Sequence, residues 1–381
     1  MNRRDFLKIA SLTPFAGMMP ELLSANSNVN ANGKIVVLVE LRGGNDALNT
    51  LIPFGHDEYY NLRPKLAIKE NNLFKLNHSM GMNKSLAPLL PYWEQGNLAW
   101  VQGLGYQNPN RSHSRSREIW TTASPIRHDK EGWVEKVFTD NNKINGVSIS
   151  EALGPLAGKG TRNLRIGSPE SFLRRAERMN KNVQTSSNSA LNHVLNTEQE
   201  IIRSLKELPD DDDLKRTANI NRYFQNKGSL GQKLASVARL IISDMTIPAY
   251  KVGLDGFDTH SQQKGKHEGL LSILADNLNT FARTMKQAGK WQDIVVVTYS
   301  EFGRKAQENS SGGTDHGLAA AHLVMGGSVK GRQIYGKTPS LSKLDAGSVQ
   351  YTEDFRSVYA TLAQRWWNKS SPWSQSQIPF V

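Results

Sequence analysis

The sequence predicts an α/β protein in which a mostly parallel central sheet is flanked by helices. Two observations support this fold class. Several apolar, β-branched runs end at glycine or at polar residues, as buried strands that lead into loops do. A long amphipathic segment, residues 270–287, separates two of these runs. A strand, a long helix and a further strand in this order are typical of a parallel sheet with crossover helices.

The first predicted strand covers residues 34–41 (KIVVLVEL) and stops just before a pair of glycines. Its nearly continuous apolar character predicts a central position, because a strand covered on both faces needs no polar side. Four later runs are also predicted strands: residues 98–104, 250–254, 293–299 and 322–325. Apolar residues at helical spacing predict a helix over residues 270–287, and another predicted helix, residues 230–245, leads back to the sheet.

The stretch from about residue 170 to 228 differs from the rest of the chain. It is polar, rich in Asn, Ser, Lys and Arg, and lacks strand-like runs, so we expect a helical insertion or cap. Within it, residues 210–213 form a short acidic run after Pro209. We interpret this run as a solvated helix start in preference to a calcium loop, because the ligand spacing of such a loop is missing.

The first residues predict a twin-arginine signal peptide. Arg3 and Arg4 precede Phe-Leu-Lys, and a short, weakly apolar stretch follows over residues 9–23. This stretch falls short of the roughly 20 residues that a membrane-spanning helix needs. We therefore expect export by the twin-arginine translocase, with the protein periplasmic or secreted.

Residues 1–31 are expected to be signal peptide and linker, outside the fold. Cleavage after Ala25 and cleavage after Ala31 are both open, and the second fits the small-x-small preference better. The remaining residues, 32–381, are enough for one large α/β domain or for two smaller ones.

Composition and net charge limit which kinds of site and which partners the protein can have. The chain has no cysteine, which excludes disulfides, thiolate metal sites and a cysteine nucleophile. Its formal charge is +12 and becomes +11 without the signal segment, which holds three basic and two acidic residues. This excess favours anionic partners, such as phosphorylated or sulfated molecules or acidic polysaccharide. The sequence shows no nucleic-acid module. After the signal segment, no apolar run approaches the length of a membrane span, so we expect neither a nucleic-acid partner nor a transmembrane anchor.

Polar clusters stand next to four of the predicted strands, where ligands bind in open parallel sheets. They are residues 42–46 (RGGND), the group Asp255, Asp258, His260 and His267, residues 300–304 (SEFGR), and residues 314–317 (TDHG). Each cluster alone has an ordinary explanation as a helix cap, a loop or a local ion pair. Their joint placement at strand ends favours a site for a divalent cation with nitrogen and oxygen ligands, such as zinc or manganese.

A further polar segment follows the second predicted strand. Ser112 stands just before the start of a predicted helix, where anions bind well and hydroxyls serve as nucleophiles. Arg111, Arg115 and Arg117 are available to an anionic group. An N-cap serine with solvated arginines explains the same residues equally well.

Several motifs closely resemble the domain-of-unknown-function 1501 family. They are residues 38–46 (LVELRGGND), 48–50 (LNT), 59–68 (YYNLRPKLAI), 111–113 (RSH), 256–260 (GFDTH), 300–304 (SEFGR) and 315–317 (DHG). The family resembles a branch of the alkaline-phosphatase-like superfamily, which also holds sulfatases, and its members are often exported by the twin-arginine pathway. The resemblance covers nearly the whole mature chain and implies one domain over residues 32–381. It also implies a two-metal site at the carboxyl edge of the sheet.

The resemblance implies roles for individual residues. The metal ligands that it implies are Asp46 after the first strand, Asp258 with His260, Glu301, and His316 as the final histidine. The residues that we expect in catalysis are Ser112, near the nucleophile position, His113 and Arg304. Zinc is the expected metal, with manganese and calcium as alternatives.

Three departures from the superfamily pattern matter. The spacing between Asp258 and His260 is short, so His260 and His267 both remain candidates for the histidine role. Phe302 stands where the superfamily has a histidine, so one metal site lacks an imidazole and is either empty or completed by Asn45, His113 or water. The sulfatase signature that yields formylglycine is absent, which counts against a standard sulfatase mechanism.

The leading hypothesis is an exported metal-dependent hydrolase of a phosphate or sulfate ester, in which Arg304 and the basic loop hold the anion. Its substrate would be an anionic small molecule or polysaccharide. The alternative hypothesis is a non-catalytic, metal-loaded binding protein for anionic surface polymers, which Phe302 favours. A structural or assembly factor that works with other exported proteins is the third.

Overall fold

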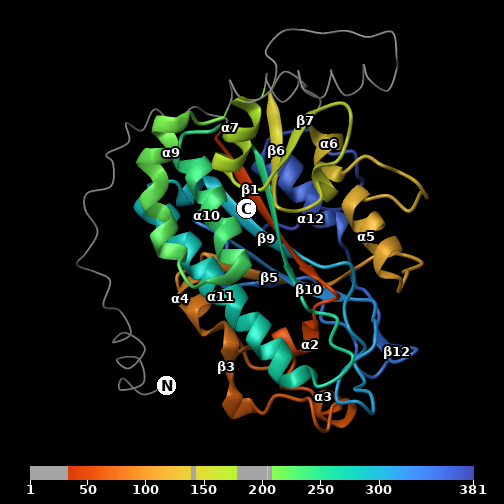
Figure 1. Ribbon diagram of the computed structural model, residues 1–381. Helices are drawn as coiled ribbons and strands as arrows, with labels where there is room; N and C mark the ends of the chain where they lie inside the picture. The colour runs from red at the N-terminus through yellow and green to blue at the C-terminus, as the bar shows by residue number, and fades with distance from the viewer. Residues whose placement is uncertain (1–32, 139–142, 178–203, 205–207) are drawn as a thin grey trace.

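The computed structural model describes residues 33–138, 143–177, 204 and 208–381 (Figure 1). The predicted signal segment, residues 1–31, and a large part of the expected insertion lie outside the described residues. Among the helices that are described, none combines the length and the apolar character needed to cross a bilayer.

A nine-stranded, mostly parallel sheet forms the centre of the fold, which confirms the predicted fold class (Figure 1). The first predicted strand is β1 (Ile35–Arg42) and lies well inside the sheet. It pairs in parallel with β8 (Ala249–Asp255) on one side and with β9 (Ile294–Tyr299) on the other. Beyond β8, the parallel strands β6 (Ile144–Ile149) and β7 (Arg162–Ile166) complete this half of the sheet.

The other half of the sheet is mixed. The last predicted strand is β10 (Ala320–Gly326), which pairs antiparallel with both β9 and β5 (Leu98–Gly105). Two short strands, β11 (Ile334–Tyr335) and β14 (Glu353–Asp354), pair in parallel with β5. The sheet thus contains an antiparallel strand that an apolar run alone does not reveal, because such a run carries no information on direction.

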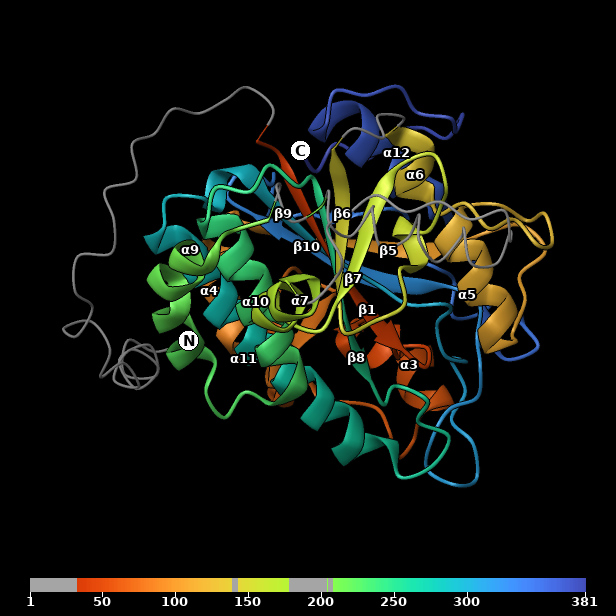
Figure 2. The same cartoon turned by 45° about the horizontal axis from the view of Figure 1, so that its top comes forward.

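Helices cover both faces of the sheet (Figures 1 and 2). Alternate residues of β1 point to opposite faces, so Val37 and Val39 belong to one apolar core and Val36 and Leu38 to the other. The first core packs under α10 (Gly228–Ile242) and α11 (Gln263–Gln287). The second packs under α5 (His113–Thr122), α6 (Trp133–Val137) and α12 (Arg356–Thr361). Coverage on both faces explains why β1 is apolar throughout.

Short elements fill the connections. Between β1 and β5 lie α2 (Ala47–Thr50), β2 (Leu51–Ile52), α3 (Asp57–Leu62), η1 (Glu70–Asn72), β3 (Leu73–Lys75), β4 (Gly81–Asn83), η2 (Lys84–Leu89) and α4 (Leu90–Glu94). Strands β2, β4 and β3 form a small antiparallel sheet. The remaining short elements are η3 (Gly154–Leu156), η5 (Trp291–Asp293), the hairpin β12 (Leu344–Asp345) with β13 (Ser348–Val349), and η6 (Leu362–Trp366).

The described parts of the expected insertion are helical: α7 (Pro169–Glu177), α9 (Asp211–Thr217) and η4 (Ala218–Phe224). The acidic run begins α9, because Asp210 caps the helix by accepting a hydrogen bond from the backbone N–H of Asp213 at 2.8 Å. This agrees with the interpretation of the run as a helix start.

Helix α11 begins seven residues before the predicted start at Leu270. The extra turns contain two glycines and few apolar residues, so they show no helical periodicity. The start of the helix is fixed by contacts with a segment that is distant in the sequence. Gln262 has a left-handed backbone (φ 49°), and the N–H groups of Gln262 and Gln263 donate to the carbonyls of Ser311 and Gly312.

His322 on β10 is buried in the second core, and neither ring nitrogen has a hydrogen-bond partner among the described residues. Burial lowers its pKa to about 3, from 6.5. Between these two pH values the unfolded chain binds a proton that the folded chain excludes. Stability therefore falls as the pH drops from 6.5 towards 3, by up to about 1.4 kcal/mol for each pH unit.

We expect the variant His322→Leu to lose less stability on acidification than the wild type, because its core holds no group that must charge. Urea unfolding midpoints at intervals between pH 7 and pH 4 measure the difference. The exposed His128, replaced by leucine, is the control and should keep the wild-type slope. Equal slopes for His322→Leu and the wild type would show that His322 is protonated in the folded chain.

Candidate metal centre

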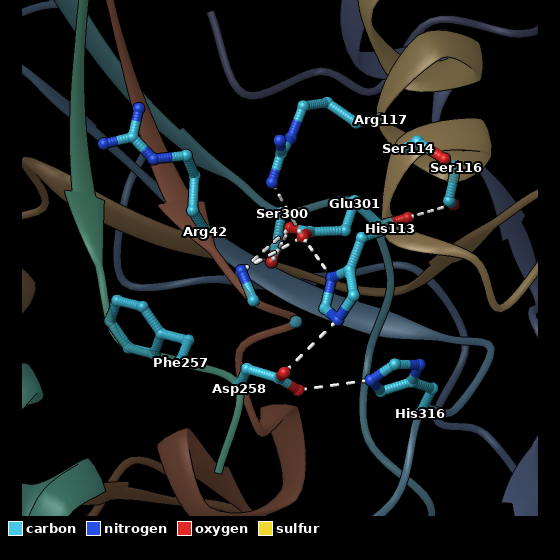
Figure 3. Close-up of polar contacts among 12 residues, drawn as sticks. Arg42, His113, Ser114, Ser116, Arg117, Phe257, Asp258, Ser300, Glu301 and His316 are labelled. Atoms are coloured by element: carbon cyan, nitrogen blue, oxygen red, sulfur yellow. Dashed lines mark hydrogen bonds and ion pairs between the residues drawn. The ribbon is translucent and has the colours of Figure 1, made fainter.

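Segments from distant parts of the chain meet at the carboxyl ends of β1, β8 and β9 (Figure 3). Asp258 and His260 follow β8, Glu301 follows β9, and His113 is the first residue of α5. His316 comes from the loop before β10, which an isolated antiparallel bridge ties to the loop after β9. The strand-end segments singled out in the sequence therefore do share one edge of the sheet.

Four side chains direct donor atoms at one another. Oδ1 of Asp258 lies 3.1 Å from Nε2 of His260 and 3.1 Å from Nε2 of His316. The two Nε2 atoms are 2.9 Å apart. On the other carboxylate oxygen, Oδ2, the neighbour is Nε2 of His113 at 3.4 Å. These four residues are called the donor group below. Carboxylate oxygens and imidazole nitrogens this close together suit zinc, whose ligands sit about 2.0–2.2 Å from the ion.

The other ring nitrogen of each histidine faces an oxygen. Nδ1 of His113 lies 2.9 Å from Oε1 of Glu301, and Nδ1 of His316 lies 2.8 Å from the backbone carbonyl of Arg111. Nδ1 of His260 lies 3.4 Å from Oδ1 of Asp315. With Nδ1 donating outward, each Nε2 presents its lone pair to the donor group, which is the usual arrangement around a bound metal. The residues present therefore fit a divalent cation.

A comparison with known protein families shows to which family this chain belongs. A family described as "Protein of unknown function (DUF1501)" matches residues 142–364, more than half of the chain. The chain belongs to the DUF1501 family. No curated protein matches it.

Some solved structures are similar to this DUF1501 protein at low identity. A 2-O GAG sulfatase is 7% identical, with 91% of this chain and 73% of that chain covered and a TM-score of 0.39. A protein in the alkaline phosphatase superfamily from Vibrio parahaemolyticus is 10% identical, with coverage of 97% and 76% and a TM-score of 0.37. The alkaline phosphatase from the Antarctic bacterium TAB5 is 9% identical, with coverage of 80% and 94% and a TM-score of 0.35.

Glu301 supports His113 and does not belong to the donor group of the DUF1501 protein. Its carboxylate is buried, accepts from the backbone N–H of Gly43 at 3.0 Å, and faces His113 and Arg117 (Figure 3). The hydroxyl of Ser116 also donates to the Glu301 backbone carbonyl. The sequence suggested that Glu301 is a metal ligand, whereas here its carboxylate lies behind His113 and orients the imidazole ring.

Arg304 is buried and does not face a position that a substrate anion could occupy. It is only 1% exposed, and its guanidinium donates to the carbonyls of Gly44 and Thr314, each at 2.8 Å. It also donates to Oδ1 of Asp258 at 2.5 Å. A guanidinium enclosed in this way has no free face for a substrate anion. The sequence suggested that Arg304 binds a substrate anion, whereas here it holds the loops that carry the donor group.

The contact with Arg304 sets the charge of Asp258. Burial favours the neutral carboxyl, but the hydrogen bond and positive charge of Arg304 outweigh it and lower the pKa of Asp258 to about 2. Burial also lowers the pKa of His316, which keeps that imidazole neutral at pH 7. A charged carboxylate and a neutral imidazole are the forms that bind a metal ion.

Asp46 is expected to be a ligand but lies apart from the donor group. Its carboxylate is 0% exposed, pairs with Arg63 at 2.6 Å and accepts from the side-chain amide of Gln263. Burial favours the neutral acid, but the charge of Arg63 outweighs it and holds the pKa of Asp46 below its ordinary value. In the DUF1501 protein the Arg63 guanidinium therefore pairs with the Asp46 carboxylate, where the sequence suggested a metal ion.

The structure shows where His260, His267 and Phe302 lie relative to the donor group. His260 contacts Asp258, whereas His267 is buried and bonded to Asn45 Oδ1 at 2.9 Å, so His260 is the histidine at the donor group. Burial lowers the pKa of His267 to about 4. The ring of Phe302 packs against the rings of His113 and His316, with centroids 4.9 and 4.5 Å away. It braces these two imidazoles and supplies no ligand.

Ser112 stands at the N-cap of α5, beside the donor group in sequence. Its side chain is exposed, makes no capping hydrogen bond to the helix, and lies 3.1 Å from the hydroxyl of Ser114. The backbone N–H groups of the first turn thus receive no side-chain cap from Ser112. An exposed hydroxyl at the positive end of a helix, bonded to the Ser114 hydroxyl, is compatible both with a nucleophile and with a simple cap residue.

Sequence patterns missed the residues that support the ligands. Arg63, Gln263 and the backbone carbonyl of Arg111 lie in separate segments of the chain, and sequence spacing does not show that they contact the ligands or their neighbours. Arg63 and Arg111 do stand in motifs of the family resemblance, residues 59–68 and 111–113, but those motifs gave them no part in orienting ligands.

Proposed function

We propose that this DUF1501 protein is an exported, metal-dependent hydrolase of a phosphate or sulfate ester. The observation that carries the proposal is the donor group, in which three imidazoles turn Nε2 toward Asp258 while each Nδ1 faces an oxygen. Such second contacts orient a ligand before the metal arrives. The excess of positive charge in the chain supports an anionic substrate.

Asp258, His260 and His316 would hold the metal, with zinc first and manganese or calcium as alternatives. Their donor atoms lie 2.9–3.1 Å from one another, whereas Nε2 of His113 lies 3.4 Å from Oδ2 of Asp258. Three protein ligands leave a position open, as in catalytic zinc sites. A bound divalent ion would polarise the ester oxygen and lower the pKa of a hydroxyl or water.

His113 is the proton carrier in this proposal. Its Nε2 faces Asp258 Oδ2 at 3.4 Å from the edge of the donor group, and Glu301 accepts from its Nδ1. A carboxylate on Nδ1 fixes the tautomer and stabilises the imidazolium that forms when Nε2 takes a proton. His113 would take the proton from the attacking oxygen and return it to the leaving group. Ser112 or a water molecule would be the attacking group.

Arg111 is the residue best placed to hold the substrate anion. Its carbonyl is bonded to His316, which fixes the residue beside the donor group. Its guanidinium makes a single 3.4 Å bond to the carbonyl of Asp345, and its Nε has no acceptor among the described residues. By contrast, Arg117 pairs with Glu301, and Arg115 pairs with Glu118. Arg111, whose guanidinium makes no ion pair within the part of the chain that the structure describes, would take the anion-binding role expected of Arg304.

A panel of aryl phosphate monoesters, aryl phosphate diesters and aryl sulfates tests this function. We expect turnover that vanishes after chelation and returns with zinc, manganese or calcium. Complete loss of turnover in Ser112→Ala would support a covalent serine intermediate, and partial loss would support attack by water. A fully metal-loaded protein that hydrolyses none of these esters would contradict the proposal.

The non-catalytic alternative has one observation in its favour. The apolar ring of Phe302, at a position where the superfamily pattern has a histidine, packs against the imidazoles of His113 and His316. A metal-loaded protein without turnover that binds a column of sulfated or phosphorylated polysaccharide, and is released by salt, would favour a binding protein for anionic surface polymers.

Export by the twin-arginine translocase is part of the proposal and is supported by Arg3 and Arg4 with the short apolar stretch behind them. It would place the enzyme in the periplasm or outside the cell. Cell fractionation in strains with and without that translocase tests it, since unchanged periplasmic levels without the translocase would contradict this route.

A further inference from the structure

Beneath the donor group lies a fully buried set of polar side chains. Asp46, Arg63 and Gln263 are each 0% exposed. The guanidinium of Arg63 donates to Asp46 at 2.6 Å and to Asn49 Oδ1 at 2.8 Å, and its Nε donates to the carbonyl of Ala306 at 2.7 Å. Buried polar groups that are satisfied in this way rigidify the structure around them.

Gln263 joins this buried set to the loops that carry the metal ligands. Its amide nitrogen donates to Asp46, while its amide oxygen accepts from the hydroxyls of Thr259 at 3.0 Å and Thr314 at 2.5 Å. Thr259 stands between Asp258 and His260, and Thr314 stands two residues before His316. One side chain therefore contacts both ligand loops. The backbone N–H of Thr314 also donates to the carbonyl of Thr259 at 3.2 Å.

We infer that Gln263 is a positioning residue for the metal ligands and that the centre takes one metal ion. Gln263 holds the loop of Asp258 and His260 against the loop of His316, and Asp46 fixes the orientation of its amide. Because Arg63 already neutralises Asp46, no second cation is needed at that carboxylate. This inference rests on the metal centre of the proposed function.

The chemistry of the contacts explains why glutamine is needed. The side chain must donate to a carboxylate at one atom and accept from two hydroxyls at another, and an amide provides both. An apolar side chain of similar size would remove one hydrogen bond each from Asp46 and from the buried hydroxyls of Thr259 and Thr314. The two loops would then separate, and the Nε2 atoms of His260 and His316 would lose their 2.9 Å spacing.

The variant Gln263→Met tests the inference in the full chain. We expect its affinity for zinc to fall about 10- to 100-fold, as other changes behind metal ligands do. The visible absorption of the cobalt-loaded protein should also change, because it reports ligand geometry. Thr259→Val, which removes one hydroxyl, should shift both quantities in the same direction by less and serves if Gln263→Met does not fold.

Asn277→Leu is the matched control. Asn277 is a buried amide on the same helix, bonded to the carbonyls of Lys227 and Ile273, and lies away from the donor group. It should lower stability and leave zinc affinity and the cobalt spectrum as in the wild type. If Gln263→Met binds zinc as tightly as the wild type does, the inference about Gln263 is overturned and the proposed function is not affected. A wild-type chain that binds neither zinc nor cobalt overturns the proposed function and the inference with it.

Discussion

Zinc binding is expected to disappear when Asp258 is replaced by asparagine or His316 by glutamine. Each substitution removes a donor atom from the three that lie within 3.1 Å of one another. The wild type should gain about 4 kcal/mol of stability at a zinc concentration 1,000 times its Kd, because only the folded chain binds the ion. The variants should gain nothing. Thermal unfolding with and without zinc, beside calorimetric titration, measures both effects.

Asp255→Asn is the control for this first prediction. Asp255 also ends β8, but it faces Arg42 and belongs to no part of the donor group. It should keep the zinc-dependent stabilisation of the wild type. Equal stabilisation of Asp258→Asn and the wild type would place the metal elsewhere and contradict the assignment of the ligands.

The second large effect concerns His113. We expect His113→Gln to lower turnover about 100- to 10,000-fold, the range for a lost acid–base group, while zinc remains bound. Glu301→Gln should reduce turnover less, because the imidazole stays but loses the carboxylate that orients Nδ1 and stabilises its charged form. Steady-state rates and metal content of the same preparations give the two readouts.

Loss of zinc together with loss of turnover in His113→Gln would show that His113 is a fourth ligand and would contradict its role as proton carrier. Arg115→Gln is the control. Arg115 stands on the same helix but pairs with Glu118, so its removal should leave both the rate and the metal content unchanged.

The fold was accessible from the sequence because buried strands have a strong local signature. The run KIVVLVEL is apolar on both faces since β1 is covered on both sides. The convergence of Asp258 and His260 with Glu301 was predictable for a related reason, since the carboxyl ends of neighbouring parallel strands meet at one edge. His316, in contrast, precedes β10 and reaches this edge because β10 runs antiparallel to β9. The antiparallel direction of β10 was not predictable, because direction is decided by pairing with distant strands.

Which partner each of the polar residues contacts could not be predicted from the sequence. Glu301 and Asp46 follow strands just as Asp258 does, yet one faces His113 and the other faces Arg63. Which carboxylate meets a metal and which meets a cation of the chain depends on side chains that lie far apart in the sequence. Arg304 shows the same effect, because the carbonyls that enclose it come from three separate loops.

Elemental analysis of the protein after gentle purification tests the central claim most directly, with the double variant Asp258→Asn, His316→Gln prepared in parallel. We expect one divalent metal ion per wild-type chain, with zinc first, and none in the double variant. Two ions per chain would contradict the role of Arg63 as the partner of Asp46. A wild type that emerges free of metal and is not stabilised by added zinc, manganese or calcium would contradict the metal centre itself.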